Sequence, residues 1–293
     1  KQPDGKIKLF NKIKERLDYI KSFPELCRKA TEFHRELSTI FYLKEIITTN
    51  WDNYFEEECN AVPIVSKDDF AFWNSPSRKV LKIHGSVNNY GSIIATKEDY
   101  IKCYKNLREG VLGSTLKHML ATKTVLFIGY SFGDNDFNKI FSFIKKEMKD
   151  ILPHAYLITS SQKFSGSLHP NITIINTDGT YFLSVLKHKL IEANDMLPDT
   201  KYERAFEGLL KVQKAHNLLL KKFDFKKNPE VLYCSSYQEG LIHAFERIIA
   251  MRSSGEYSDS HHVGHLVQGY DVLQKDKSKK EKFADVAYIE GYI

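Results

Sequence analysis

Short apolar runs of strand length recur through the first two thirds of the chain, and most are separated by stretches long enough for a helix. Runs of this length and composition are typical of buried strands. They are Glu45 to Thr49, Val62 to Val65, Val80 to His84, Thr124 to Gly129, His154 to Thr159 and Ile172 to Asn176. Because strands that alternate with helices form parallel sheets, the sequence predicts an α/β fold with a Rossmann-like, doubly wound, mostly parallel sheet.

Helices are predicted on both sides of this region and within it. Residues 1–45 carry apolar side chains at helical spacing, with a break near Ser22-Phe23-Pro24. Further helical patterns lie at Asp136 to Met148, Glu203 to Phe223 and Tyr237 to Arg252, and Phe283 to Ile293 has the pattern of a helix start. Beyond Leu190 the patterns are helical only. We therefore expect a sheet-containing domain at residues 1–195 and an all-helical region at residues 196–293.

Composition argues against several classes of protein. The net charge of +6, from 43 basic and 37 acidic residues, is a mild excess, so we do not expect direct nucleic-acid binding. The four cysteines are widely separated and form no Cys-x-x-Cys pair, so neither a metal site nor a disulfide framework is predicted. The longest apolar stretch, Thr124 to Phe132, is far below the roughly 18 residues of a membrane span. We expect a cytoplasmic protein.

Small and polar residues follow four of the apolar runs. They are Thr48-Thr49-Asn50-Trp51-Asp52, His84-Gly85-Ser86, Gly129 to Asp136, and Asn176 to Gly179. In an open parallel sheet, ligands bind outside the carboxyl ends of the strands. The sequence therefore predicts one crevice lined by hydroxyl, amide, imidazole and glycine groups.

Each of these segments also has a purely structural interpretation. Asn50 or Asp52 could cap the helix that begins near Asn53, and His84 could be a core histidine. The segment that begins at Gly129 could be an ordinary strand-to-helix turn capped by an aspartate. The occurrence of all four segments in order, at successive strand ends, favours a shared site.

As an ordered set, Thr-Thr-Asn-Trp-Asp, Ile-His-Gly-Ser and Gly-Tyr-Ser-Phe-Gly-Asp-Asn-Asp resembles the sirtuin-like domains of bacterial anti-phage defence proteins, which hydrolyse NAD. The resemblance covers roughly Glu45 to Leu190. It implies that Asn50 and His84 are the catalytic pair and that NAD is the substrate, without a metal. The positions that it implies for NAD binding are Thr48, Thr49, Asp52, Gly85, Gly129, Ser131, Asp134 and Asn176.

The residue types suit this chemistry. Cleavage of the nicotinamide–ribose bond passes through an oxocarbenium-like state, so the enzyme must position water and polarise ribose hydroxyls. The amide of Asn50 can hold water or ribose, and the imidazole of His84 can take a proton near neutral pH. Ser131 and nearby backbone amides are suited to a ribose or a phosphate.

Two features depart from the patterns of related families. The sirtuin-like family opens with a strand and a Gly-x-Gly-x-Ser loop that approaches the pyrophosphate, and nothing before Thr48 resembles it. We expect this loop upstream of Lys1, and we expect the natural chain to extend beyond Ile293 as well. Classical deacylases carry a four-cysteine zinc module after the His-Gly motif, which has no counterpart here, so deacylation of protein lysines is the weaker interpretation.

The expected function is hydrolysis of NAD to nicotinamide and ADP-ribose by an abortive-infection effector. Uncontrolled hydrolysis would kill the host, so we expect activity to depend on homo-oligomerisation or on a second defence protein. A HerA-like ATPase or an Argonaute-type sensor would suit the resemblance, with residues 196–293 as the interaction domain. The alternative is a module that binds NAD or ADP-ribose as a signal without turnover.

Overall fold

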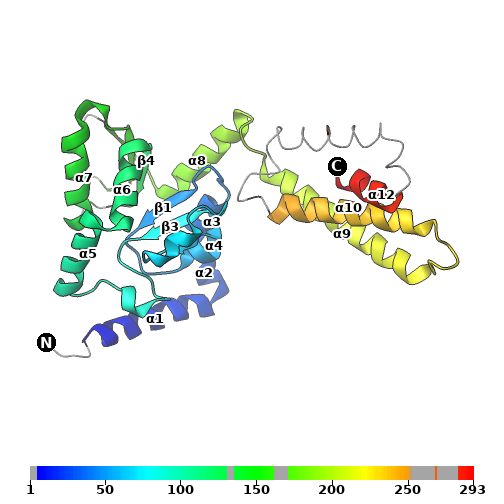
Figure 1. Ribbon diagram of the computed structural model, residues 1–293, viewed down its shortest axis with the longest axis horizontal. Coiled ribbons are helices and arrows are strands. Elements are labelled where there is room, and N and C mark those ends of the chain that lie inside the picture. Colours follow the sequence, from blue (N-terminus) through cyan, green and yellow to red (C-terminus); the bar gives the residue numbers. More distant parts are fainter. Residues whose placement is uncertain (1–4, 131–134, 162–170, 251, 253–267, 269–282) are drawn as a thin grey trace. The chain divides into compact units, whose positions relative to one another are not determined.

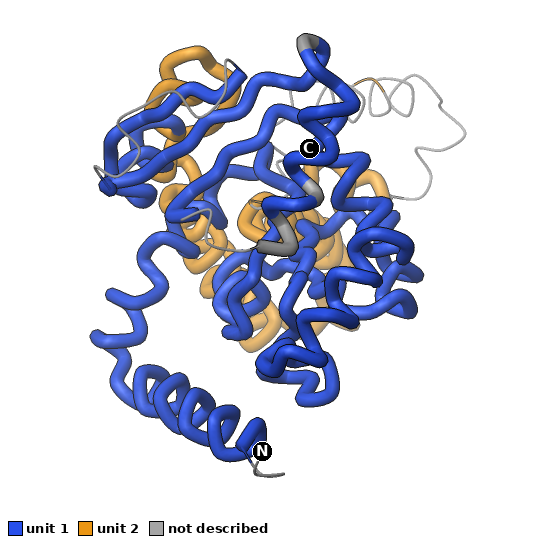
Figure 2. The backbone as a smooth tube through the Cα atoms, turned by 90° about the vertical axis from the view of Figure 1, so that its left-hand side faces the viewer, with its two compact units in different colours: residues 1–186 blue, residues 187–293 orange. Residues whose placement is uncertain are grey.

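A computed structural model describes residues 5–130, 135–161, 171–250, 252, 268 and 283–293. The chain divides into two compact units, residues 1–186 and residues 187–293, which are coloured separately in Figure 2. The division falls within helix α8 (Gly179–Glu192), whereas the sequence analysis places a domain boundary near residue 195. The functional assignment of the two domains stays a prediction.

The first unit opens with three helices, α1 (Gly5–Ser22), α2 (Pro24–Ala30) and α3 (Glu32–Ser38), shown in blue in Figure 1. Phe23 separates α1 from α2 in an extended conformation, with φ −118° and ψ 104°. A residue before proline is held in this region by the proline ring, and proline itself is well suited to the first turn of a helix. The break therefore lies where the sequence predicts it.

All the described strands are parallel, and each overlaps one of the six predicted runs, although the third strand begins one residue before its run, at Lys79. One sheet has the order β1-β3-β2 and the other has the order β4-β5-β6. Their bounds are β1 (Glu45–Thr48), β2 (Val62–Ile64), β3 (Lys79–Lys82), β4 (Val125–Ile128), β5 (Ala155–Thr159) and β6 (Ile172–Asn176). The mixed α/β, parallel architecture is as predicted. The described strands differ from the prediction in forming two three-stranded sheets instead of one.

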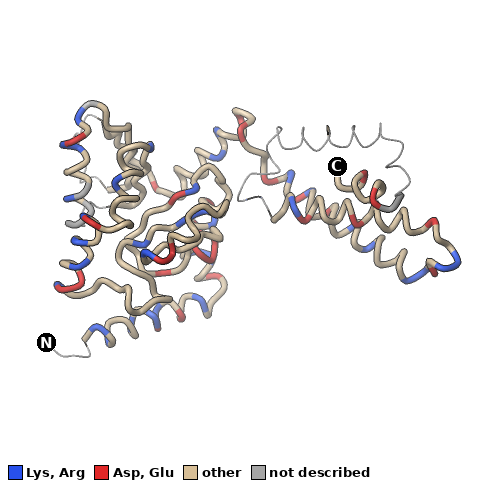
Figure 3. The backbone as a smooth tube through the Cα atoms, in the orientation of Figure 1, with Lys and Arg blue, Asp and Glu red and all other residues tan. Residues whose placement is uncertain are grey.

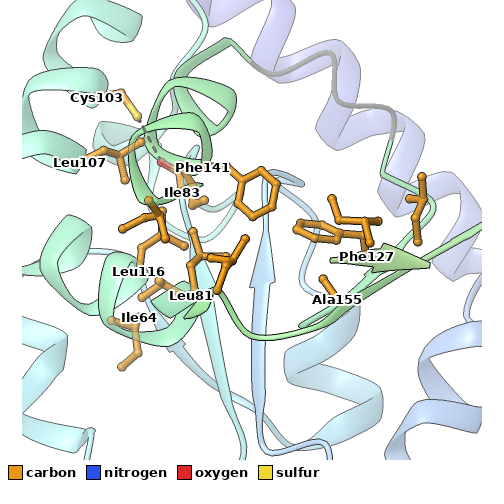
Figure 4. Close-up of a cluster of buried hydrophobic side chains, with 14 residues drawn as sticks. Ile64, Leu81, Ile83, Cys103, Leu107, Leu116, Phe127, Phe141 and Ala155 are labelled. Carbon is orange, nitrogen blue, oxygen red and sulfur yellow. Dashed lines mark hydrogen bonds between the residues drawn. The ribbon is translucent and has the colours of Figure 1, made fainter. Parts of the chain in front are cut away.

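The two sheets share a hydrophobic core. Ile64 and Leu81 of the first sheet lie in one buried cluster with Phe127 and Ala155 of the second (Figure 4). Helices contribute to the same cluster, for example through Leu116, which is fully buried. The remaining helices of this unit are α4 (Tyr54–Cys59), α5 (Lys97–Glu109), α6 (Val111–Thr122) and α7 (Asn135–Met148), with short 3-10 turns η1 (Asp68–Phe72), η2 (Tyr90–Ser92) and η3 (Lys149–Ile151).

The described elements of the second unit are the helices α9 (Asp199–Lys222), α10 (Val231–Ala250) and α12 (Phe283–Tyr292). Basic and acidic residues are interspersed along α9 and α10 (Figure 3). Helices α10 and α12 approach each other closely at glycines. A Cβ on Gly240 of α10 would lie only 2.0 Å from the main-chain oxygen of Tyr288 in α12. In the described ranges, no helix combines the length and the apolar character needed to cross a membrane.

Strands β1 and β4 are each the edge of their sheet. In parallel pairing, successive residues direct their N–H and C=O groups alternately to the two sides of a strand. The main-chain oxygen of Thr48 accepts a hydrogen bond from Ile83 N at 2.9 Å, so the N–H and C=O groups of Thr48 face β3. The N–H and C=O groups of Ile47 therefore point to the open edge. Gly129 N donates to Ile158 O at 3.2 Å and so faces β5, as does every second residue before it. The N–H and C=O groups of Leu126 therefore point to the other open edge.

We expect the backbone amides of Ile47 and Leu126 to exchange with solvent faster than those of Thr48 and Phe127. The second pair donates within a parallel ladder, whereas the first pair points out of it. Native-state hydrogen exchange of the 293-residue chain, read residue by residue, checks this. Equal protection within each strand would contradict it and would mean that both edges are already paired.

Candidate active site

A cavity of about 890 Å³ lies along the open edges of β1 and β4 and continues past their carboxyl ends. Along the strands the cavity is lined by apolar residues of β1 and β4, such as Ile47 and Leu126. Beyond the carboxyl ends of the strands its rim consists of polar and small residues, namely Thr48, Thr49, Asn50, Gly129, Thr159, Ser160, Ser161, Thr177 and Asp178. The size lies in the range of about 300–1,000 Å³ that is usual for ligand sites.

Four predicted site residues meet at this cavity. Thr48, Thr49 and Asn50 line it from the end of β1, and Gly129 lines it from the end of β4. Asn50 is exposed, and its main-chain N donates to Thr48 Oγ1 at 3.1 Å. The parallel pairing therefore places hydroxyl and amide groups at the position where the sequence analysis expects them.

The predicted catalytic partner lies just outside the cavity lining. His84 directly follows Ile83, a lining residue, at the carboxyl end of β3. It is only 6% exposed, and its ring stands edge-on to Tyr100 with centroids 5.3 Å apart. The structure thus brings His84 to the same end of the sheet as Asn50, with the imidazole packed behind the wall.

The other predicted residues are not part of the lining. Asp52 Oδ1 accepts a hydrogen bond from Tyr54 N at 3.3 Å, in the turn before α4, which is close to its capping interpretation. Gly85 adopts a φ of +87° next to His84. Asn176 ends β6 and is paired with Thr159 in the ladder. Ser131 and Asp134 lie outside the described residues.

The cavity also includes polar residues that the sequence analysis did not name as NAD-binding positions, although it placed Asp178 in a polar segment after a strand. Thr159 ends β5 and is followed by Ser160 and Ser161, and Ser161 N donates to Thr159 Oγ1 at 3.1 Å. Asp178 caps α8, because its Oδ1 accepts from Thr180 N at 2.8 Å. The signal was available, since Thr159 to Ser161 repeats the pattern of small polar residues seen after the other strands.

One titratable lining residue had no sequence signal. His34 of α3 lines the cavity, and its ring packs against Phe55 at a centroid distance of 4.6 Å. Burial lowers the pKa of His34, although the charges of Asp52 and Glu58 partly oppose this. The imidazole is therefore neutral at pH 7 and can offer one donor and one acceptor. No pattern in the sequence indicates that His34 belongs to a site, because only the tertiary packing of α3 brings it to the cavity.

Helix α1 packs against the loops that follow β1 and β3. Phe10 lies in a small cluster with Val87 and Ile93, against which Trp51 packs. Near the amino end of α1, Lys6 pairs with Asp99 at 2.9 Å. The Asp99 carboxylate also accepts from the main-chain N of Ala95 and Thr96, at 3.1 and 3.0 Å, and completes a capping box at the start of α5.

We expect Asp99→Asn to destabilise the fold at pH 7 and to have a diminishing effect in acid. Burial raises the pKa of Asp99, but hydrogen bonds from Lys6, Ala95 and Thr96 outweigh burial and hold the pKa well below its usual range. A carboxylate whose pKa is lower in the folded than in the unfolded protein stabilises the fold at any pH above its unfolded pKa of about 3.9. This stabilisation is lost as the pH falls through the pKa of the folded state. Urea unfolding of both proteins between neutral and acidic pH checks this.

The matched control for that experiment is Asp68→Asn, which removes an exposed carboxylate at the start of η1. It should leave the unfolding midpoint nearly unchanged across the same pH range. A penalty for Asp99→Asn that did not shrink in acid would contradict the assignment of the stabilising form to the carboxylate.

Two glycines at the site differ in what surrounds them. Gly85 has a φ of +87°, and a Cβ there would lie 2.2 Å from the main-chain oxygen of Ser92. Gly129 has a φ of +63°, and a Cβ there would meet nothing within 4 Å. A left-handed backbone disfavours alanine at both positions, but only Gly85 is also closed by the neighbouring main chain.

We therefore expect Gly85→Ala to lower the free energy of unfolding by about 3 kcal/mol or more, because backbone strain and overpacking add. Gly129→Ala should cost only about 1 to 2 kcal/mol, from the backbone conformation alone. Urea denaturation of the two variants provides the comparison. Equal losses would show that the close approach of Ser92 to Gly85 is not maintained in solution.

Comparison with known proteins places this region in a family. The family model for the SIR2-like domain matches residues 44–182, which takes in β1 to β6 and the cavity residues that follow them. The match ends near the start of α8 and covers none of α1, α9 or α10.

Three characterised relatives are similar over parts of the chain. Defense-associated sirtuin 2 of Bacillus subtilis is 24% identical over 175 residues, which is 57% of this chain and 17% of that protein. NAD(+) hydrolase ThsA of Enterococcus faecium is 32% identical over 128 residues, 42% of this chain and 26% of that protein. NAD(+) hydrolase ThsA of Cytobacillus dafuensis is 34% identical over 105 residues, 33% of this chain and 21% of that protein.

The chain thus spans no more than about a quarter of the length of these relatives. The similarity includes a defence-associated sirtuin as well as two NAD(+) hydrolases. Residues 44–182 thus match the SIR2-like domain family and form a sirtuin-like domain within the chain.

Proposed function

We propose that this protein hydrolyses NAD to nicotinamide and ADP-ribose at the cavity above β1 and β4. The observation that supports this most directly is the convergence of Thr48, Thr49, Asn50 and Gly129 on one cavity within a SIR2-like domain. The relatives named NAD(+) hydrolase point to the same substrate. NAD is consumed in this reaction and is not recycled.

In the proposed reaction, the polar rim binds the ribose hydroxyls and places water beside the nicotinamide–ribose bond. Asn50 is exposed to the cavity and can hold the water or a ribose hydroxyl through its amide. His84 takes a proton from the water or the hydroxyl, from its position one residue beyond the cavity wall. The remaining predicted binding residues Asp52, Gly85, Ser131, Asp134 and Asn176 would complete the site around the nucleotide.

The proposal includes a single doubly wound sheet. A strand that ran parallel between β1 and β4 would pair with both open edges and unite the sheets in one layer. Its neighbours would then lie about 9.6 Å apart, twice the usual strand spacing. Lys123, two residues before β4, forms an ion pair at 2.5 Å with Glu45 at the start of β1, which a gap of this width permits. The glycine-rich loop expected from the resemblance would follow such a strand.

The proposed biological role is that of an anti-phage effector in the cytoplasm, gated by assembly. The helical unit exposes large apolar side chains on α9 and α10, including Phe206, Leu210 and Leu232. Such side chains are suited to a protein contact. Homo-oligomerisation or a second defence protein, of the HerA-like ATPase or Argonaute type, would supply that contact and switch on hydrolysis.

We expect Asn50→Ala and His84→Ala each to reduce nicotinamide release from NAD by about 100-fold or more, which is the usual effect of removing a positioned acid–base group. The assay uses the full-length protein with and without candidate partners. Asn88→Ala and His118→Ala are matched controls, because both side chains are exposed and neither lines the cavity. They should retain the wild-type rate.

The same assay separates the alternatives. Loss in Asn50→Ala but not in His84→Ala would keep the site and remove His84 from the catalytic pair. Binding of NAD or ADP-ribose without release of nicotinamide would favour the signal-binding module. Release that strictly required an acylated peptide would favour the deacylase. Unchanged release in both variants would overturn the assignment of the site.

A further inference from the structure

A fully buried lysine stands directly behind the predicted catalytic loop. The Lys82 side chain, at the carboxyl end of β3, is 0% exposed. Its Nζ lies 2.8 Å from Glu56 Oε1, whose side chain is 13% exposed, and also donates to the main-chain oxygen of Asp52. A buried ammonium group is costly unless it is paired and hydrogen-bonded, so both contacts are needed to keep it there.

Both partners of Lys82 belong to the segment that carries Asn50. This segment runs from the end of β1 at Thr48 to the first turn of α4, which contains Glu56. Lys82 therefore connects β3 to the far side of the loop through one main-chain oxygen and one helical carboxylate. The loop cannot move away from β3 without breaking a buried ion pair.

Two further hydrogen bonds define the same loop. Ile83 N donates to Thr48 O at 2.9 Å, and Val87 N donates to Trp51 O at 2.7 Å. Together with the contact from Lys82 to Asp52 O, they fix the main chain on both sides of Asn50. Of the three donors, Lys82 alone is a side chain, and so it alone can be removed by substitution without altering the main chain.

We propose that Lys82, through its ion pair with Glu56, is a positioning residue that sets the place of Asn50 in the cavity. The inference rests on the proposed function, in which Asn50 acts on the nicotinamide ribose. Lys82 does not line the cavity and so does not touch the substrate. Its contribution is to the geometry of the reacting groups, where a displacement of about 1 Å can cost on the order of 100-fold in rate.

Lys79 provides a matched comparison on the same strand. It is 5% exposed, and its Nζ donates to Ser75 O at 2.6 Å and to Ser77 O. It lies at the amino end of β3, opposite Glu45, and so at the end of the sheet away from Asn50. Removing either lysine disturbs a buried cation in β3, but only Lys82 contacts the loop.

The test compares Lys82→Met with Lys79→Met in the full-length protein, activated as in the hydrolysis assay. Both should unfold at lower temperature than the wild type. Lys82→Met should lower kcat by about 100-fold at temperatures well below unfolding, with a much smaller change in KM. Lys79→Met should keep a kcat close to the wild-type value. Equal kcat values for the two variants would overturn the proposal.

A double variant separates positioning from stability. Lys82→Met/Glu56→Leu removes both charges, and replacement of a buried ion pair by apolar groups often restores stability. Its melting temperature should recover relative to Lys82→Met while kcat stays low, because Asp52 O still lacks its donor. Recovery of kcat together with stability would assign the pair a structural role only.

A readout that does not need turnover keeps this inference separate from the proposed function. The NMR signal of the Asn50 side-chain amide should shift in Lys82→Met and stay in place in Lys79→Met. An unshifted signal in Lys82→Met would overturn the positioning role, whether or not the protein hydrolyses NAD. A shifted signal in a protein that releases no nicotinamide would keep the positioning role and reject the proposed reaction.

Discussion

The parallel pairing of β1 with β3 is the constraint on which the candidate site depends. Because Thr48 lies opposite Lys82, both strands end at the same edge of the sheet, and the loops that follow them emerge side by side. Asn50 and His84, distant in the sequence, therefore lie in loops that follow neighbouring strands. The cavity lies between β1 and β4 and extends beyond their carboxyl ends. Its polar rim is therefore made of residues at or after the ends of parallel strands.

Three buried cations, Arg78, Lys79 and Lys82, lie in β3 or directly before it, and each has different hydrogen-bond acceptors. Arg78 is buried, and burial lowers its pKa; it donates to main-chain oxygens including Leu43 O at 2.7 Å and Ile40 O at 2.9 Å, near the end of α3. Lys79 donates to two serine carbonyls, and Lys82 binds a carboxylate and a carbonyl. Since buried cations must be paired or hydrogen-bonded, these contacts constrain the helices and loops around the strand.

The open edges of β1 and β4 connect the fold to the proposed function. Unpaired strand edges are normally covered or blunted, and here two of them border one cavity. The shared core shows that both sheets fold as parts of one unit. A strand that paired with both edges would unite the two sheets and leave the polar rim of the cavity at their carboxyl ends.

The sequence by itself determined the six strands, the polar residues at their ends and the family. Strand length, helical periodicity and local motifs are properties of neighbouring residues, and they were enough to select Thr48, Thr49, Asn50 and Gly129, which line the cavity. Only the tertiary structure decided that His34 lines the same cavity, that His84 packs behind it, and that Lys82 contacts the loop. These depend on which strands pair and which side chains lose contact with water, and such long-range contacts leave no periodic trace in a single sequence.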